Sequence, residues 1–385
     1  MEPEIQPPQP EAPLAGRDTT SHATDTVAPS LGERIFHWMN WTFAGSQGLR
    51  AGWSALIFVL LLGLIGSAVG FVFIGFHIVD LNQMDHLTAS LAAREKLMEV
   101  LALVGAMSAM AFIERRRSLL AYNLTGSRRI PHFLSGLVAG FAALSVLVGA
   151  MAWGGWLHIG PVALSGVGIL KYGALWAIAF LLVGCVEEGT FRGYLQFTLT
   201  RGINFWWALG SVVLLCASLY ARALGISGWG VYAIALLGIL PCLMLHIRKS
   251  PGANFWQAAW VTSTVFGFIH TSNNGENWIG IFAAAAIGFV FCVSIWVTGS
   301  AWWAIGCHAG WEWAESYFYG TADSGMQAQG HYLTSSPAGQ ALWSGGTDGP
   351  EGSLLVLGAI LLLLAALLAI YGRKKPVALL VVEAG

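Results

Sequence analysis

Long runs of apolar residues, separated by short polar stretches, form most of the chain. A run of about 18–20 apolar residues is long enough to cross the hydrocarbon core of a bilayer as a helix. The pattern predicts spans at roughly 52–77, 95–113, 133–154, 168–190, 204–221, 229–246, 255–270, 279–298, 301–318 and 353–371. The sequence therefore predicts an all-α protein, a polytopic transmembrane helical bundle with about ten spans.

The basic residues between these runs indicate the orientation of the bundle. Cytoplasmic loops of membrane proteins carry an excess of Lys and Arg. Four basic groups fall on one side of the membrane if there are ten spans and the N-terminus is cytoplasmic; they lie at 115–129, 201, 248–249 and 373–375. We therefore expect a multi-pass integral membrane protein with both termini in the cytoplasm.

The two ends of the chain differ from its middle. Residues 1–50 are predicted to be a cytoplasmic part, which begins as a disordered tail rich in Pro, Glu, Ser and Thr. Its second half, residues 31–50, places aromatic side chains among polar ones, which is typical of an interfacial helix. The transmembrane domain is expected over 51–375, and residues 376–385 form a short C-terminal tail.

Two features subdivide the transmembrane domain. The sequence GINFW at 202–206 recurs as GANFW at 252–256, which suggests that a helix pair was inserted at about 204–250; chance similarity explains the echo equally well. The long loop 319–350, expected outside the cytoplasm, contains Gly, Ser and Pro together with aromatic residues. Loops of this length are either functional or disordered, and its aromatic content favours an ordered segment that covers a site.

The composition is typical of a membrane protein and argues against a nucleic-acid-binding protein. Of 385 residues, 56% are hydrophobic and 10% are charged, against about 25% charged in ordinary soluble domains. The net charge of −1 gives no case for nucleic-acid binding. The five cysteines lie in apolar segments without a close pair, so they are interpreted as small buried side chains.

The stretch CVEEGTFRGYLQ, residues 185–196, breaks this apolar pattern. It places Glu187, Glu188 and Arg192 directly after a run without charge. A charge at the centre of a membrane helix costs about 2.5–3.5 kcal/mol on insertion scales, so such groups are paired or functional. Glu188 and Arg192 are spaced i,i+4 and can pair on one helical face. Glu187 lies about 100° around the helix and is the first candidate for chemistry.

Three of the ionisable residues in or beside the later spans are further candidates for chemistry. His270 ends the seventh span, and His308 and Glu312 share a face of the ninth with i,i+4 spacing. Taken singly, each could be a loop residue or a satisfied contact between helices. Taken with Glu187, they can converge in the bundle and activate water, either by themselves or by holding a metal.

These residues, in this order, resemble a known signature. Glu187-Glu188-x-x-x-Arg192, Phe266-x-x-x-His270 and His308-x-x-x-Glu312 are similar to the three motifs of the CPBP family of intramembrane proteases, which includes CAAX prenyl endopeptidases and bacteriocin-immunity (Abi-type) proteins. The resemblance covers roughly 100–325 and implies a core of eight helices.

The resemblance also implies roles for the motif residues. Glu187 and His270 would activate the attacking water, and His308 and Glu312 would stabilise the oxyanion of the scissile carbonyl. Supporting positions would be Glu188, Arg192 and Asn273.

Two departures from the family pattern bear on these roles. The family generally has Asn, sometimes Asp, where this chain has Glu312. An ionised glutamate cannot donate a hydrogen bond, so Glu312 would have to be protonated, orient His308 or ligate a metal. The stretch of about fifty residues between the first two motifs is also longer than usual.

The cofactor is left open by the residues. Glu187, His270, His308 and Glu312 could together form a zinc site of His₂Glu₂ character. The resemblance to archaeal CAAX proteases instead implies a glutamate-activated water, and we favour no tightly bound metal. Other intramembrane proteases fit less well, because the chain has neither His-Glu-x-x-His nor Gly-x-Gly-Asp, and the Gly-Ile-Ser-Gly at 225–228 is too short a motif to identify a rhomboid protease.

The sequence thus predicts a peptidase, glutamic or metal-dependent, that cleaves a peptide or membrane protein at or in the membrane. Its expected surroundings are membrane lipid, in the bacterial cytoplasmic membrane. A non-proteolytic scaffold or immunity-like protein of the same fold is the first alternative. A transporter in which the buried carboxylates and histidines relay protons is the second.

Overall fold

A computed structural model describes most of the chain. The described residues are 30–45, 48–79, 88–116, 118–203, 205–206, 208–210, 212–213, 240–241, 243–248, 252–273 and 275–372. The chain divides into two compact units, Met1–Phe43 and Ala44–Gly385. The first contains helix α1 (Leu31–Phe43), which buries none of its residues and exposes Phe36, Trp38 and Trp41. The predicted helix at 31–50 is therefore present, although it ends at Phe43.

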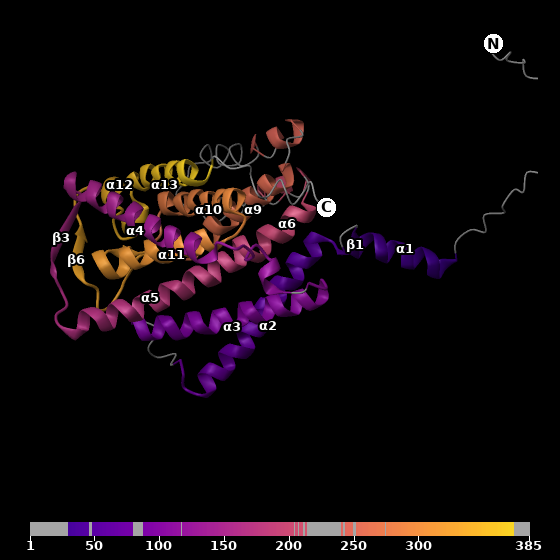
Figure 1. The fold of residues 1–385 in the computed structure, drawn as a ribbon, viewed down its shortest axis with the longest axis horizontal. Helices are drawn as coiled ribbons and strands as arrows, with labels where there is room; N and C mark the ends of the chain where they lie inside the picture. Colours follow the sequence, from indigo (N-terminus) through magenta and orange to yellow (C-terminus); the bar gives the residue numbers. More distant parts are fainter. Residues whose placement is uncertain are drawn as a thin grey trace, which may run out of the picture. The chain divides into compact units, whose positions relative to one another are not determined.

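The second unit is mainly helical, and three of its long helices lie side by side. Helix α2 (Ala51–Gly75) packs on α3 (Ala89–Ile113), and α3 lies alongside α5 (Val167–Glu188), as Figure 1 shows. Just before α2, the two-residue strands β1 (Ala44–Gly45) and β2 (Gly48–Leu49) pair with each other.

Helix α5 does not stop where the sequence predicts. Instead of ending near residue 190, it continues through a π-helical segment, Gly189–Leu195, into α6 (Gln196–Gly202), so one helix spans Val167–Gly202. The wider π turn occurs where Arg192 is fully buried. Single π turns inside α-helices are frequent at functional sites.

Glycines bring helix α4 (Arg129–Trp153) against α11 (Trp302–Glu312). A methyl group on Gly140 would overlap the carbonyl oxygen of Cys307, and one on Gly310 would overlap the carbonyl oxygen of Leu137. Gly136 and Gly306 make equally close approaches, so each helix contributes a Gly-x-x-x-Gly pair. Small residues at this spacing let membrane helices pack backbone to backbone.

The remaining long helices complete the core. Helix α9 (Ala253–Ile269) packs on α10 (Trp278–Thr298), and α13 (Leu355–Tyr371) contacts both α10 and α4. Helix α11 continues into a second π-helical segment, Trp313–Tyr319. The largest cluster of buried apolar side chains lies among these helices and includes Leu144, Phe291, Trp303 and Ile360.

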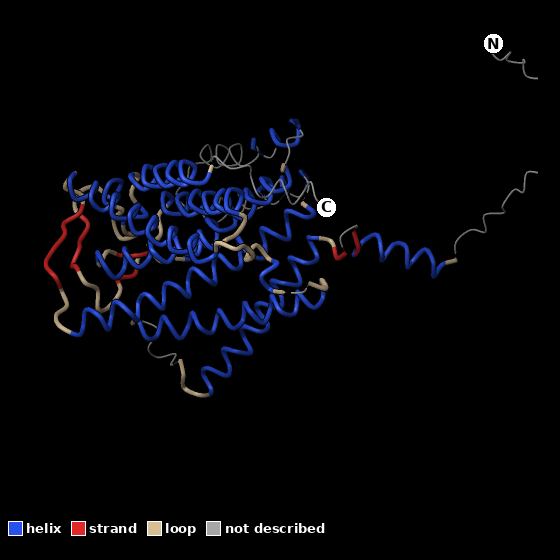
Figure 2. Tube along the Cα trace, viewed as in Figure 1, coloured by secondary structure: helices blue, strands red, loops and turns tan. Residues whose placement is uncertain are grey.

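The 319–350 segment is ordered and contains short strands as well as one short helix, so the protein is not purely α-helical. Strands β4 (Ala322–Asp323) and β5 (Met326–Gln327) form a hairpin, and β6 (Leu333–Pro337) pairs antiparallel with β3 (Leu157–Val162). Helix α12 (Ala341–Ser344) follows. Figure 2 shows the β3–β6 ribbon in red at one end of the helices.

Five helices among the described residues are long and apolar enough to cross a membrane: α2, α3, α4, the continuous helix from α5 to α6, and α10. The sequence predicts ten. Helices α9 and α13 have 17 residues each, and α11 is shorter because its last turns are π-helical. The spans predicted at 204–221 and 229–246, and with them most of the suggested insertion, lie largely outside the described residues.

Candidate active site

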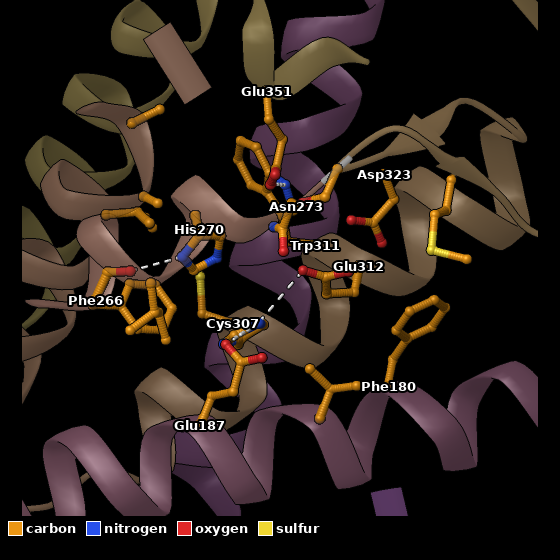
Figure 3. Close-up of a pocket in the computed structure, with 18 of the residues that line it drawn as sticks. Phe180, Glu187, Phe266, His270, Asn273, Cys307, Trp311, Glu312, Asp323 and Glu351 are labelled. Atoms are coloured by element: carbon orange, nitrogen blue, oxygen red, sulfur yellow. Dashed lines mark hydrogen bonds and ion pairs between the residues drawn. The ribbon is translucent and has the colours of Figure 1, made fainter. Parts of the chain in front are cut away.

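The four candidate catalytic residues come from separate parts of the fold and line one cavity of about 420 Å³. Glu187 lies in the last turn of α5, His270 directly follows α9, and α11 supplies His308 and Glu312. Figure 3 shows Glu187, His270 and Glu312 facing the same space from different helices. The structure therefore brings together all three motifs recognised in the sequence.

The predicted pair Glu188–Arg192 is formed and is fully buried. Arg192 Nε lies 3.3 Å from Glu188 Oε2, and Arg192 Nη1 donates a hydrogen bond of 3.4 Å to Glu188 Oε1. The guanidinium carbon also lies 4.3 Å from the centre of the Phe266 ring, in a cation–π contact. Isolated buried charges are costly, so the pair and the ring stabilise each other's positions.

Glu188 has a second partner that the sequence did not indicate. Its Oε1 lies 3.0 Å from His308 Nδ1, so the same carboxylate contacts both Arg192 and His308. A carboxylate that is ionised against Arg192 can only accept hydrogen bonds, so Nδ1 carries the proton and donates. Glu188 thereby fixes the ring of His308 as well as the helix.

The other nitrogen of His308 faces two carboxyl groups. His308 Nε2 lies 3.4 Å from Glu312 Oε1 and 3.8 Å from Glu187 Oε2. The His308 side chain is 9% exposed and Glu312 is 15% exposed, whereas Glu187 is 26% exposed and borders the cavity more openly. The His308 ring on α11 therefore contacts two carboxyl groups of α5, those of Glu187 and Glu188, in addition to Glu312 on its own helix.

His270 is held by its own helix. Its Nδ1 lies 2.7 Å from the carbonyl oxygen of Phe266, and a carbonyl can only accept a hydrogen bond. Nδ1–H therefore donates, which leaves the lone pair of the neutral ring on Nε2. The Phe266 and His270 rings also meet edge to face, with centroids 4.8 Å apart. Such a ring can orient water through Nε2.

Asn273, predicted as a supporting residue, also lines the cavity. Its side-chain amide donates a hydrogen bond of 3.1 Å to Glu276 Oε2, in the turn that connects His270 to α10. Burial and the nearby charge of Asp348 raise the pKa of Glu276 to about 7. Burial likewise raises the pKa of Asp348 to about 6. This turn is therefore held partly by carboxyl groups that titrate near neutral pH.

Carboxyl groups from the 319–352 region reach the cavity and were missed in the sequence. Asp323 from β4 and Glu351 both line it. Glu351 Oε1 accepts a hydrogen bond of 2.7 Å from the indole of Trp311, which also donates one of 3.0 Å to Glu315 Oε2. The ordered loop expected at 319–350 was the only sequence signal for them, because neither residue belongs to a recognisable motif.

Most of the remaining cavity wall is apolar. It includes side chains from α5, α10, α11 and α13, namely Trp176, Ala179, Phe180, Ile287, Phe291, Cys307 and Ile360. Lys96 and Glu95 from α3 add one charge of each sign. A cavity with a few convergent polar groups and apolar walls is typical of a small-ligand or substrate site.

The zinc interpretation has no geometric support. Among the described residues, no three His, Cys, Asp or Glu side chains are placed so as to hold a metal ion. His308 Nδ1 is hydrogen-bonded to Glu188, and Nε2 lies at ion-pair distance from one oxygen of Glu187 and one of Glu312. We therefore derive no chemical step through a metal.

The fold and the cavity together define a multi-pass helical membrane protein with a buried polar site. Residues 242–314 match the Rce1-like type II CAAX prenyl endopeptidase family, so the chain carries a domain of that family, and the resemblance to CPBP proteases is confirmed. The matched region contains His270, His308 and Glu312, but Glu187 lies outside it. Searches of curated proteins and of solved structures found no match. A domain of this family implies a peptidase with a peptide or protein substrate.

Proposed function

We propose that the chain is an intramembrane endopeptidase in which Glu187 and His270 activate the attacking water. The observation that supports this proposal is the convergence of Glu187, His270 and His308 on one cavity, from three parts of the fold. Glu187 is the least buried of the carboxylates around His308 and is the one available to a water molecule in the cavity.

In this proposal the reaction starts with proton transfer from water to Glu187. The water oxygen forms a bond to the scissile carbonyl carbon, and the electron pair of the C=O π bond moves to the carbonyl oxygen. His270 accepts a hydrogen bond from the water through Nε2 and so orients it. When the intermediate collapses, the C–N bond breaks and the proton held by Glu187 passes to the leaving nitrogen, which restores the carboxylate.

His308 and Glu312 are proposed to stabilise the oxyanion. His308 can donate to the oxyanion through Nε2 when both ring nitrogens carry hydrogen, while Nδ1 stays hydrogen-bonded to Glu188. Hydrogen bonds aimed at developing charge are usually the largest single contribution to catalysis of acyl transfer. Glu188 and Arg192 act as positioning residues, and Asn273 supports the turn that carries His270.

The substrate class follows from the cavity walls and from the family. The apolar lining suits an apolar peptide segment or a lipid chain beside the scissile bond. The family name points to prenylated peptides that end in a CAAX sequence. We also propose the ten-span arrangement with cytoplasmic termini, which the basic residues between the spans support.

A direct assay tests the proposal. The purified protein in detergent is incubated with an internally quenched, farnesylated CAAX peptide and with the same peptide lacking the farnesyl group. Glu187→Gln and His270→Ala should each lower cleavage by roughly 10²–10⁴-fold, the range for loss of a general base. Glu33→Gln, which changes an exposed carboxylate on α1 outside the cavity lining, should cleave like the wild type.

The outcome also separates the proposal from its rivals. Equal cleavage by wild type, Glu187→Gln and His270→Ala would remove the catalytic assignment. A well-folded wild type that cleaves neither peptide nor a panel of membrane peptides would favour the non-proteolytic scaffold.

A further inference from the structure

Glu312 occupies the position at which the family generally has asparagine, and a second carboxyl group lies against it. Asp323 belongs to β4, in the hairpin that follows the π-helical end of α11, and its side chain is hydrogen-bonded to that of Glu312. Both residues line the cavity, and Figure 3 shows them next to each other. Asp323 Oδ2 also accepts a hydrogen bond of 2.9 Å from Ser316 Oγ, which holds the carboxyl group in place.

A hydrogen bond between two carboxyl groups requires a proton. Ionised carboxylates have only acceptors, so one member of the pair must keep its hydrogen for the contact to form. Two carboxylates that share a buried site rarely ionise together, because their charges repel at short range. Burial raises the pKa of the Asp323 carboxyl, in agreement with a pair that retains a proton.

The surroundings make a second negative charge at this pair costly. The following charged or titratable groups line the cavity or interact electrostatically with its carboxyl groups: Glu187 on α5, His308 and Glu315 on and after α11, Glu351 and Asp348 in the turn before α13, His270 and Glu276 beside α10, and Glu95 and Lys96 on α3. Most of these groups are acidic. His308 Nε2 lies 3.4 Å from Glu312 Oε1.

We propose that Asp323 is a positioning residue for Glu312, that the two carboxyl groups hold one proton between them, and that Glu312 carries this proton and turns the O–H from Asp323 to the oxyanion when the substrate is bound. This inference rests on the proposed peptidase function. It resolves the departure at position 312, because a neutral carboxyl group supplies a donor where an asparagine amide would otherwise do so. No covalent bond is made or broken at the pair, and the proton stays on Glu312 throughout the reaction.

The pH profile of cleavage tests the role of Asp323. The wild type should lose activity at alkaline pH as the shared proton leaves. Asp323→Asn removes a negative charge beside Glu312, so Glu312 ionises more easily and the loss should begin at lower pH. Glu312→Gln carries a permanent donor, so the part of the alkaline loss that comes from Glu312 should disappear. Any loss that comes from His308 should remain, and adding Asp323→Asn to Glu312→Gln should have no further effect on the profile. Identical profiles for wild type and Asp323→Asn would overturn the proposal.

A measurement without substrate separates this inference from the peptidase assignment. Infrared difference spectroscopy distinguishes the carbonyl stretch of a protonated carboxyl group from that of a carboxylate. The wild type at neutral pH should show a protonated band that both Glu312→Gln and Asp323→Asn change or remove. Ser316→Ala, which deletes the other hydrogen bond to Asp323, should keep the band. If the band is the same in wild type, Glu312→Gln and Asp323→Asn, the shared proton is refuted whether or not the protein cleaves peptides.

Discussion

Glu188 and His308 are 120 positions apart in the chain and are joined by a hydrogen bond of 3.0 Å between Oε1 and Nδ1. The same carboxylate is paired with Arg192, and both members of that ion pair are fully buried. The orientation of His308 therefore depends on a charge that Arg192 stabilises. Loss of the Glu188 or the Arg192 charge should therefore lower the stability of the fold and also disturb the orientation of His308.

Glu188→Gln should destabilise the protein and reduce cleavage. The substitution leaves the buried guanidinium of Arg192 without its counter-charge, and breaking a buried pair in this way costs about 3–5 kcal/mol. The thermal unfolding midpoint in detergent should fall accordingly. The double variant Glu188→Gln/Arg192→Met replaces the pair by neutral groups, so much of the stability should return while cleavage stays low. Recovery of both together would show that Glu188 serves only the fold.

The residues of this site could be predicted from the sequence, whereas most of the contacts between them could not. The positions of Glu187, His270 and His308 were recognisable because charged and imidazole side chains are rare in apolar runs. The spacing of Glu188 and Arg192 also predicted their ion pair correctly. The contact from Glu188 to His308 could not be predicted, because it depends on the rotation of α5 relative to α11, which no local pattern encodes.

The π-helical segments and the folded loop explain the remaining differences. Gly189–Leu195 has apolar residues on both sides of Arg192, so its sequence gives no sign of the wider turn. Asp323 and Glu351 stand among ordinary loop residues and reach the cavity only because β4 and the turn at 350–352 fold back over it.

The glycine contact between α4 and α11 should be essential to the geometry of the site. In Gly140→Ala the new methyl group meets the carbonyl oxygen of Cys307, one residue before His308, so α11 must move away from α4. We expect a loss of about 1–3 kcal/mol in stability, typical of overpacking, together with a loss of cleavage. Gly149→Ala is the matched control on the same helix, because a methyl group there meets nothing within 4 Å. A Gly140→Ala protein that cleaves like Gly149→Ala would show that the site tolerates displacement of α11.

The indole of Trp311 should be needed to keep two buried carboxyl groups in place. Trp311→Phe removes the donor that Glu315 and Glu351 share, at 3.0 and 2.7 Å, while most of the aromatic packing remains. An unsatisfied buried polar group costs about 1–3 kcal/mol, so the unfolding midpoint should fall. Adding Glu351→Gln removes one acceptor charge and should restore part of the loss. If Trp311→Phe is as stable as the wild type, the two hydrogen bonds contribute nothing measurable.

The turn that follows His270 should make stability depend on pH. Burial and Asp348 raise the pKa of Glu276 from 4.5 to about 7, so between these values the folded protein keeps a proton that the unfolded chain releases. The contribution of this group is therefore fully present below pH 4.5 and is lost as the pH rises through about 7. Asp348 acts in the same direction, with its pKa raised from 3.8 to about 6. Thermal unfolding measured from acid to neutral pH should show a decline that Glu276→Gln flattens and that Glu99→Gln leaves unchanged. If the unfolding midpoint of Glu276→Gln declines with pH as steeply as that of the wild type, the ionisation of Glu276 does not destabilise the folded protein. The pH dependence must then come from other carboxyl groups around the cavity.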